Sequence, residues 1–394
     1  MLLPTLLMGT LFPLAIKIMH FRMPTFGRLA GDVYAVNTMG AILGAFCGGF
    51  VLIPMFGIQG SALYMVYLNL ILGLLVILIA PPTGQGSWLS KQGFLRGGLI
   101  GGILILTGSL VAVKPSWNAQ IMSTGVFLHL PEHAAQLGQA DRKKFYQELE
   151  KDRELLFYKE GITATITVER HQSLGLYMRV NGRKEAGERF MRTQALIAHI
   201  PMLMAQKPDD VLIIGFGSGA TAGSAAKYPV KKVRVVELEP AVIEASRFFE
   251  PENQRPLDDP RVEVQINDGR NALLASSEAF DVIISQPSVP WITGASNLFT
   301  REFFDLGAMH LKEGGIFGQW ISGDVISPEN FRSLVKAFHE AFPITWLFET
   351  IPGDYLLVGS REQPDLSMDK LEGIFGQESI RQDLMRVGVK DPYD

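Results

Sequence analysis

A buried strand followed by a glycine-rich turn is the feature that most restricts the fold of this chain. Residues 211–214 form an uninterrupted apolar run, and glycines follow at positions 215, 217 and 219. Such a run predicts a parallel strand that is buried on both faces. The glycines let main-chain N–H groups approach a ligand closely, and the small residues from Ala220 onward predict a helix whose free N–H groups favour a polar or anionic ligand. We therefore expect a Rossmann-like α/β domain.

Acidic residues follow the next two predicted strands. Residues 233–236 lead into Glu237, and residues 262–266 lead into Asp268. An acidic side chain at the end of the second strand is placed to accept hydrogen bonds from ribose hydroxyls. We expect Asp268 to face an adenine amino group. Glycines alone would also fit a tight turn in an unrelated α/β protein, but the two acidic residues favour an adenosine-bearing ligand.

The spacing of the glycines distinguishes between adenosine ligands. A dinucleotide such as NAD prefers Gly-x-Gly-x-x-Gly and a seat for its pyrophosphate. Here Ala220 stands where that pattern has its third glycine. S-adenosylmethionine or a relative is therefore the preferred ligand.

The N-terminal part of the chain is apolar enough for a membrane. Residues 33–56, 60–80 and 97–113 are each long enough to span a bilayer, and residues 1–19 are a further candidate that lacks a basic leader. Glycines at 40, 44 and 48 allow close approach of helices, and we favour packing within one bundle over a dimer seam. We expect three spans, or four if the N-terminal segment crosses, with truncation at the N-terminus.

The orientation of these spans is not decided by charge. Lys17, Arg22 and Arg28 precede the first clear span, and Lys91 and Arg96 precede the last. The positive-inside rule makes both loops cytoplasmic, which would send the rest of the chain to the opposite side. S-adenosyl ligands, however, are made and kept in the cytosol. We therefore expect a multi-pass protein of the inner (cytoplasmic) membrane with its C-terminal part in the cytoplasm.

A small β-domain precedes the glycine turn. Side chains alternate in character over residues 163–168, and Asn181-Gly182 favours a two-residue hairpin turn. A helix is expected over residues 188–205. The predicted division is residues 1–114 for the transmembrane helices, 115–205 for a connector with the β-hairpin domain, and 206–394 for the Rossmann-like domain.

Charge and composition exclude some classes of function. The formal net charge of −4 gives no reason to expect a nucleic-acid partner. The single cysteine excludes an intrachain disulfide. His129 and His133 superficially resemble a metal pair, but Pro131 lies between them and no further ligands cluster nearby, so no metal is expected.

The loop that follows the fourth predicted strand, residues 280–284, is expected to carry reacting groups. Such loops leave the carboxyl end of the sheet, where α/β proteins hold their ligands. It contains Gln286, Ser288, Pro290 and Trp291. Trp291 can either close over a ligand or pack a corner, and the sequence favours neither.

Together these motifs resemble the spermidine synthase (polyamine aminopropyltransferase) family over about residues 155–360. The resemblance is carried by the glycine turn, Val-Glu-x-Glu-Pro at 236–240, Asp-Asp-Pro-Arg-Val at 258–262 and Asn-Asp-Gly-Arg at 267–270. The apolar N-terminal part, with Asp32 to Asn37 and Ser285 to Trp291, resembles the membrane-fused bacterial branch. The resemblance implies a methyltransferase-type sheet behind a β-domain, a role in polyamine biosynthesis, and a homodimer.

The resemblance also implies which residues bind the nucleoside and the substrate. The nucleoside end of the family site is kept, and the residues expected there are Gly215, Gly217, Ser218, Gly219, Glu237, Glu239, Asp268 and Gly269. Gln194 is expected to be a polar substrate contact, together with Trp291.

The amine-handling end of the family site departs from the pattern. The family's Asp-Ser-Ser-Asp-Pro loop is replaced by residues 286–290, with Gln286 and Val289 in place of the two aspartates. The catalytic residues that this loop still offers are therefore Gln286 and Ser288. General-base help is worth about 10²–10⁴-fold, so we expect ordinary putrescine aminopropylation to be crippled unless another carboxylate substitutes. The candidates are Glu185, Glu188 and Glu302.

Two functions remain open. The first is a membrane-anchored transferase that uses S-adenosylmethionine or its decarboxylated form, with a polyamine or another amine, even a lipid-associated one, as acceptor. Aminopropyl transfer, methyl transfer and cleavage of the sulfonium all stay open for it. The second is a non-catalytic sensor of an adenosyl ligand, or a transporter-associated domain.

Overall fold

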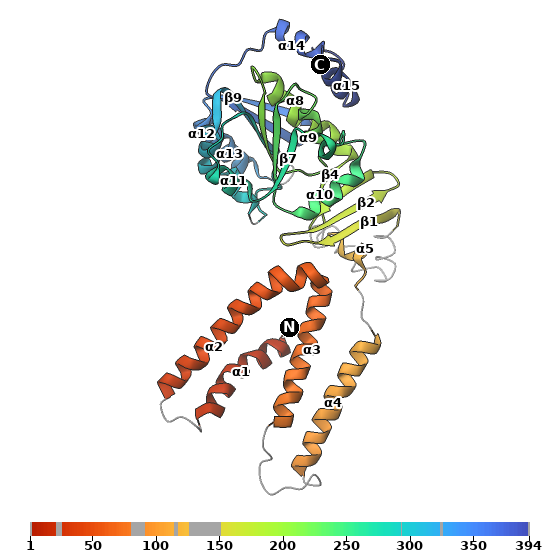
Figure 1. The fold of residues 1–394 in the computed structure, drawn as a ribbon, viewed down its shortest axis with the longest axis vertical. Helices are drawn as coiled ribbons and strands as arrows, with labels where there is room; N and C mark the ends of the chain where they lie inside the picture. The colour runs from red at the N-terminus through yellow and green to blue at the C-terminus, as the bar shows by residue number, and fades with distance from the viewer. Residues whose placement is uncertain are drawn as a thin grey trace. The chain divides into compact units, whose positions relative to one another are not determined.

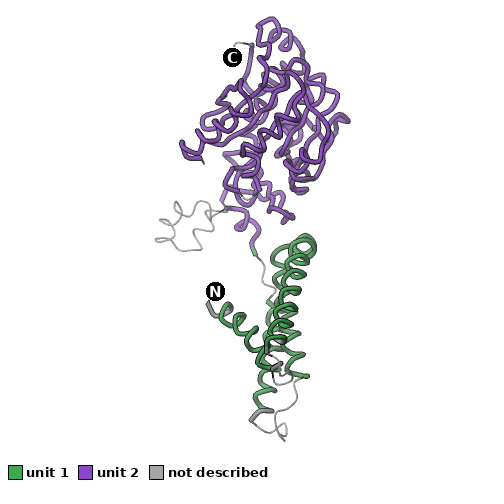
Figure 2. Tube along the Cα trace, turned by 90° about the vertical axis from the view of Figure 1, so that its left-hand side faces the viewer, with its two compact units in different colours: residues 1–117 green, residues 118–394 purple. Residues whose placement is uncertain are grey.

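The computed structural model describes residues 2–20, 26–79, 91–113, 117–125, 151–292, 294–323 and 326–392. The predicted histidine pair at 129 and 133 lies outside these residues, as does Arg22. The chain divides into two units, residues 1–117 and residues 118–394, which Figure 2 distinguishes by colour. Each unit is described by itself. The division of the second unit at residue 205 remains a prediction.

The first unit is helical. Its elements are α1 (Leu2–His20), α2 (Phe26–Cys47), the π-helical turn η1 (Gly48–Leu52), α3 (Ile53–Ile79) and α4 (Lys91–Val113). Gly57 has a φ of +71° and interrupts the regular helix near the start of α3. Figure 1 shows the chain reversing direction between α2 and α3. Two of the three predicted spans, 33–56 and, as far as residue 79, 60–80, therefore lie on either side of Gly57 within the helical stretch Ala30–Ile79.

Apolar side chains cover the surface of this unit. The stretch Ala30–Ile79 and the helix Phe94–Val113 are long and apolar enough to cross a membrane, by length and composition, and Thr5–Ile18 is a shorter apolar helix. The side chains of Val76 and Ile79 are 68% and 78% exposed. These values describe a surface that is better matched to an apolar surrounding than to water.

The second unit begins with a small antiparallel sheet. After a short helix, α5 (Ala119–Met122), four strands pair in chain order: β1 (Arg153–Glu160), β2 (Thr165–His171), β3 (Gly175–Val180) and β4 (Arg183–Gly187). Asn181 and Gly182 connect β3 to β4 with φ values of +50° and +81°. Both values are positive, as a two-residue hairpin turn of this kind requires. The predicted hairpin is confirmed.

A seven-stranded mixed sheet forms the centre of the unit, in the order β10-β11-β9-β8-β5-β6-β7. Strands β9, β8, β5, β6 and β7 are parallel; β11 runs antiparallel to β9, and the edge strand β10 runs antiparallel to β11. The strands are β5 (Asp210–Ile214), β6 (Lys232–Glu237), β7 (Val262–Ile266), β8 (Phe280–Ser285), β9 (Leu311–Ser322), β10 (Ile344–Ile351) and β11 (Asp354–Ser360). This order gives the Rossmann-like domain that the sequence predicts. The sequence reading missed the edge strand β10.

Helices cover both faces of this sheet, as Figure 1 shows. One face carries α8 (Met191–Met204), α9 (Ala220–Ala225), α10 (Pro240–Ser246), α14 (Met368–Phe375) and α15 (Glu378–Arg386); the other carries α11 (Gly269–Ala275), α12 (Arg301–Met309) and α13 (Pro328–Ala341). Strand β5 shows why its sequence is continuously apolar. Val211 and Ile213 pack into the core beneath α8 and α9, and Leu212 and Ile214 pack into the core beneath α12 and α13, on the opposite face.

Candidate functional site

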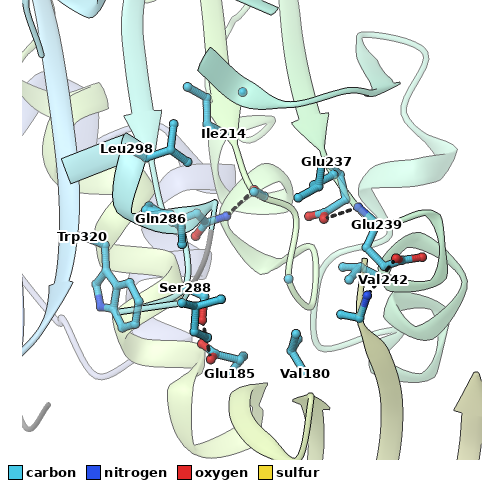
Figure 3. Close-up of a pocket in the computed structure, with 18 of the residues that line it drawn as sticks. Val180, Glu185, Ile214, Glu237, Glu239, Val242, Gln286, Ser288, Leu298 and Trp320 are labelled. Atoms are coloured by element: carbon cyan, nitrogen blue, oxygen red, sulfur yellow. Dashed lines mark hydrogen bonds between the residues drawn. The ribbon is translucent and has the colours of Figure 1, made fainter. Parts of the chain in front are cut away.

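A cavity of about 240 Å³ lies where the carboxyl ends of β5, β6 and β8 face the small sheet. Its floor is the glycine turn after β5, and its walls come from β3, β4 and α8 as well as from the loop after β8. Such crevices at the carboxyl edge of an α/β sheet are the usual ligand sites of these folds. Figure 3 shows the side chains that line it.

The glycine turn is tight enough to require glycine. Gly215 has a φ of +92°, and a Cβ there would lie 2.8 Å from the main-chain oxygen of Gln286. Gly217 has a φ of +56°, but the nearest atom to a Cβ there would be Nε2 of Gln194 at 3.6 Å. Both residues line the cavity. Gly215 thus lets two loops meet, and Gly217 leaves open space above the turn for a ligand.

Glu237 stands at the end of β6 and braces the same turn. Its Oε2 accepts a hydrogen bond from the N–H of Phe216 at 2.8 Å, and its Oε1 accepts one from the N–H of Glu239 at 2.9 Å. Burial raises the pKa of Glu237, although the main-chain hydrogen bonds lower it in part. A carboxylate can accept about four hydrogen bonds, so this side chain can still accept from a ligand.

The other residues predicted at the nucleoside end differ in their surroundings. Asp268 and Gly269 line the cavity, and Asp268 caps α11 by accepting a hydrogen bond from the N–H of Asn271 at 2.8 Å. Gly269 packs on Ile214 so closely that a Cβ would lie 2.4 Å from that side chain. Gly219, with a φ of +88°, precedes α9 and does not line the cavity.

Two predicted residues are engaged within the protein. Glu239 lines the cavity, but its Oε2 accepts from the N–H and Oγ1 of Thr163 at 2.8 and 2.9 Å, which ties the small sheet to α10. Ser218 is fully buried beneath the turn, and its Oγ donates to Oε1 of Gln194 at 2.6 Å. Gln194 itself lines the cavity. The binding roles assigned to these three residues remain predictions.

The loop after β8 brings Gln286 and Ser288 to the cavity. Gln286 donates from Nε2 to the carbonyl of Gly215 at 2.8 Å and accepts at Oε1 from Thr221 at 2.7 Å. Ser288 donates from Oγ to Oε1 of Glu185 at 2.6 Å. The amide of Gln286 is therefore occupied at both ends by the protein, whereas Ser288 is directed to a carboxylate.

Trp291 lies outside the cavity. It lines a separate outer groove with residues such as Phe299 and Leu334, and its side chain is 53% exposed. The guanidinium of Arg183 lies 5.6 Å from its ring, within the range of a cation–π contact. The assignment of Trp291 to substrate remains a prediction.

The structure distinguishes the three glutamates that could replace the missing aspartates. Glu185 on β4 lines the cavity, and its side chain is 11% exposed. Glu188 lies outside the cavity lining and accepts from the N–H of Leu176 at 3.1 Å. Glu302, in the first turn of α12, also lies outside the lining, and hydrogen bonds at the helix start lower its pKa.

Burial raises the pKa of Glu185, although the charge of Arg183 and the hydrogen bond from Ser288 lower it in part. Nε of Arg183 lies 3.1 Å from Oε1 of Glu185. Carboxylates with raised pKa values in a cleft are candidates for proton transfer.

Asp354 is a cavity residue that the sequence reading missed. It begins β11, is 8% exposed, and its Oδ2 accepts from Oγ1 of Thr193 at 3.2 Å. Because β11 runs antiparallel to β9, Asp354 lies opposite Ser322 at the carboxyl end of that strand. The sequence shows an acidic residue directly before the apolar residues of β11. This residue could be assigned to the site only with the knowledge that β11 runs antiparallel to β9.

The charge of the cavity lining is uniform. Within the described residues, five carboxylate side chains line the cavity and no lysine, arginine or histidine does; the five are Glu185, Glu237, Glu239, Asp268 and Asp354. In the same described residues, no group of histidine, cysteine or acidic side chains is arranged to hold a metal ion. The cavity therefore suits a ligand with positive charge.

Comparisons with known proteins agree with this geometry. Residues 191–355 match the family described as "Spermine/spermidine synthase domain". The polyamine aminopropyltransferase of Bacillus subtilis is 37% identical over 154 residues, which cover 39% of this chain and 55% of that protein. The enzyme of the same name from Bacillus mycoides is 36% identical over 154 residues, covering 39% and 56%. This chain thus spans little more than half the length of these curated relatives.

Two solved structures resemble the chain. A spermidine synthase in complex with the transition-state analogue AdoDATO gives a TM-score of 0.52 at 26% identity, covering 57% of this chain and 79% of the other. Spermidine synthase from Thermotoga maritima gives 0.51 at 26% identity, covering 57% and 78%.

Proposed function

We propose, from the premise that residues 191–355 form a spermine/spermidine synthase domain on the spermidine synthase fold, that this protein transfers an aminopropyl group to an amine. The donor is decarboxylated S-adenosylmethionine. The matched relatives are polyamine aminopropyltransferases, which are transferase enzymes.

The observation that carries the choice of donor is the charge of the cavity. Decarboxylated S-adenosylmethionine bears a sulfonium and an ammonium, so both its charges are positive. S-adenosylmethionine bears a carboxylate as well, which would need a cation in a cavity whose described lining holds acids but no basic side chain. Burying an unpaired carboxylate beside other carboxylates is costly. The decarboxylated compound is the better match.

The nucleoside end of the donor fits the tips of β6 and β7. Glu237 accepts from the ribose hydroxyls, and Asp268 lies at the next strand end to meet the adenine amino group. Gly217 leaves room for the sulfur-bearing arm over the turn. The sulfonium is already an activated leaving group, so the remaining task of the protein is to position the acceptor.

The first unit is proposed to anchor the protein in the inner membrane. Support comes from its two long apolar helical stretches and their exposed apolar side chains. The donor is a cytosolic compound, so the second unit is placed in the cytoplasm. Recovery of the full chain in the soluble fraction of lysed cells, without detergent, would remove the anchor from this proposal.

The test of the activity uses the purified full chain. It is incubated with decarboxylated S-adenosylmethionine or with S-adenosylmethionine, each with and without a panel of amines, and the nucleoside products are measured by mass spectrometry. We expect methylthioadenosine from the decarboxylated donor when an amine is present. S-adenosylhomocysteine from S-adenosylmethionine would instead establish methyl transfer. Donor binding without any product across the panel would establish the sensor function.

A further inference from the structure

We propose that Glu185 receives the acceptor amine and takes its proton, in place of the aspartates that this chain lacks at positions 286 and 289. This inference rests on the aminopropyl transfer proposed above. It assigns a proton acceptor to an element, β4 of the small sheet, that is distinct from the loop after β8.

The position of Glu185 separates it from the donor end. Figure 3 shows Gln286, Ser288 and Glu185 on the left side of the cavity and Glu237 and Glu239 on the right. Glu237 and Glu239 stand at the tip of β6, where the nucleoside is expected. Glu185 is thus placed across the cavity from the nucleoside, on the side from which an acceptor would approach the sulfur-bearing arm.

Glu185 keeps one oxygen for a ligand. Within the described residues, its contacts with Ser288 at 2.6 Å and with Arg183 at 3.1 Å both go to Oε1. Oε2 can therefore accept a hydrogen bond from an amine. The two contacts fix the orientation of the side chain, which is what a positioned base requires.

The other polar groups of the cavity are less suited to this role. Gln286 carries no charge, and both ends of its amide are hydrogen-bonded to the protein. Glu239 is held by Thr163 and caps α10. Asp354, held by Thr193, lies at the start of β11 and supplies a second negative charge to the cavity.

The chemical step balances without a further reactant. The neutral amine nitrogen attacks the aminopropyl carbon next to the sulfonium, so a C–N bond forms and the C–S bond breaks. The electron pair of the broken bond goes to sulfur and gives neutral methylthioadenosine. The proton lost from the new ammonium goes to the Glu185 carboxylate and then to solvent when the product leaves.

The protonation of Glu185 is set by few groups. Burial raises its pKa, Arg183 on the same strand lowers it, and Ser288 from the loop after β8 lowers it by its hydrogen bond. The other titratable groups of the cavity lining are Glu237, Glu239, Asp268 and Asp354. A pKa above the ordinary glutamate value brings this base closer to the operating pH, which favours proton transfer. The base must be ionised, so activity rises as the pH passes upward through that pKa.

The experiment compares Glu185→Gln with Glu188→Gln in the full chain, with decarboxylated S-adenosylmethionine as donor and the best amine of the panel as acceptor. Glutamine matches glutamate in shape and keeps the contact with Ser288, but it cannot take a proton. We expect E185Q to lower kcat by about 10²–10⁴-fold while methylthioadenosine still binds with wild-type affinity. E188Q, three residues along the chain and outside the cavity lining, is expected to keep wild-type kcat.

A third variant, Ser288→Ala, tests the assignment without removing the carboxylate. It deletes the hydrogen bond that lowers the pKa of Glu185. The rising limb of the kcat/KM profile should therefore move to higher pH, and this limb should be absent in E185Q. A wild-type kcat for E185Q, or a limb that S288A does not move, overturns the role of Glu185 but leaves the transferase intact. If the wild-type chain releases no methylthioadenosine with any amine, the proposed function fails and Glu185's role fails with it.

Discussion

The side chain of Gln286 holds the glycine turn through Gly215, to whose main-chain carbonyl its Nε2 donates a hydrogen bond of 2.8 Å. The other end of the same amide accepts from Oγ1 of Thr221, at the start of α9, at 2.7 Å. An aspartate could reproduce neither contact fully, because it is one methylene shorter and a carboxylate cannot donate to a carbonyl. The residue that departs from the family's acid is thus a brace between β8 and the turn.

Replacing this brace by the family's acid should therefore cost stability. We expect Gln286→Asp to lower the free energy of unfolding by about 1–3 kcal/mol, since the Gly215 carbonyl loses the donor from Gln286, whereas the Thr221 hydroxyl keeps the carbonyl of Gln194. Urea unfolding of the detergent-solubilised chain measures this. Gln286→Glu keeps the length and should cost a similar amount, because it sets a carboxylate against the carbonyl. A stable Q286D variant with increased turnover would contradict the assignment of Gln286 as a brace.

The glycine turn gives a matched pair of substitutions. Gly215→Ala must adopt a φ of +92° and bring its Cβ within 2.8 Å of Gln286 O, whereas Gly217→Ala has a φ of +56° and ordinary contacts. We expect G217A to lower the free energy of unfolding by about 1–2 kcal/mol and G215A to lower it further. G217A should weaken donor binding, because its methyl group enters the cavity. Equal losses of stability in the two variants would show that the close approach of Gln286 O to Gly215 adds nothing to the cost of the substitution.

The carboxylate of Glu237 should govern the affinity for the nucleoside. Hydrogen bonds to charged groups are worth about 1.5–3 kcal/mol, so we expect Glu237→Gln to weaken methylthioadenosine binding by about 10- to 100-fold. Isothermal titration calorimetry measures the change. Glu263→Gln is the control, because Glu263 lies on the neighbouring strand β7 but pairs with Lys232 on the surface. Unchanged affinity in E237Q would remove the ribose contact from the proposed site.

A buried network fixes the C-terminal helix α15 to the core. Asp383 accepts from Ser224 at 2.6 Å, lies 3.0 Å from Nε2 of His199, and pairs with Arg386 at 2.7 Å. Burial by itself would raise the pKa of Asp383, but the hydrogen bonds from His199 and Ser224 and the charges of His199 and Arg386 hold it well below its usual range. The folded state therefore favours the ionised form of this side chain.

This network makes stability depend on pH with a definite sign. Because the folded-state pKa of Asp383 is depressed, its contribution is fully present above the ordinary aspartate value of about 3.9 and is lost as the pH falls toward the lower folded-state value. We expect Asp383→Asn to lower the free energy of unfolding at neutral pH by about 3–5 kcal/mol and to flatten its dependence on pH below about 4. Unfolding curves at a series of pH values measure both effects. The exposed Asp365→Asn serves as the control, and a D383N variant as stable as this control would contradict the prediction.

Much of the fold was predictable because the decisive signals are local. The apolar run before Gly215 and the Asn181-Gly182 turn each determine their structure within a few residues. Strand β10 was missed because it lies at the edge of the sheet and pairs with β11, which comes after it in the sequence. Its burial does not alternate regularly, because its first three residues are all partly buried and only Thr350 is fully buried, which weakens the strand pattern.

The site was less predictable because its contacts join distant parts of the chain. Ser288 meets Glu185 across 103 residues, and Thr193 meets Asp354 across 161. Spacing along the sequence carries no information about such pairs. It also could not show that Glu239 binds Thr163, since both of these polar residues could equally have faced a ligand.

Asp354 enters the cavity at the start of a strand that runs against its neighbours, and Glu185 enters from a separate small sheet. These two acids therefore stand on strands other than β5, β6 and β7, although β11 belongs to the same seven-stranded sheet as those three. On the proposed function, mutations on β4 or β11 would alter the choice of amine without changing the residues proposed to bind adenosine. On the same proposal, a chain with Gln286 and Val289 at the positions of the two family aspartates would keep its donor and take its acceptor from a different part of the fold.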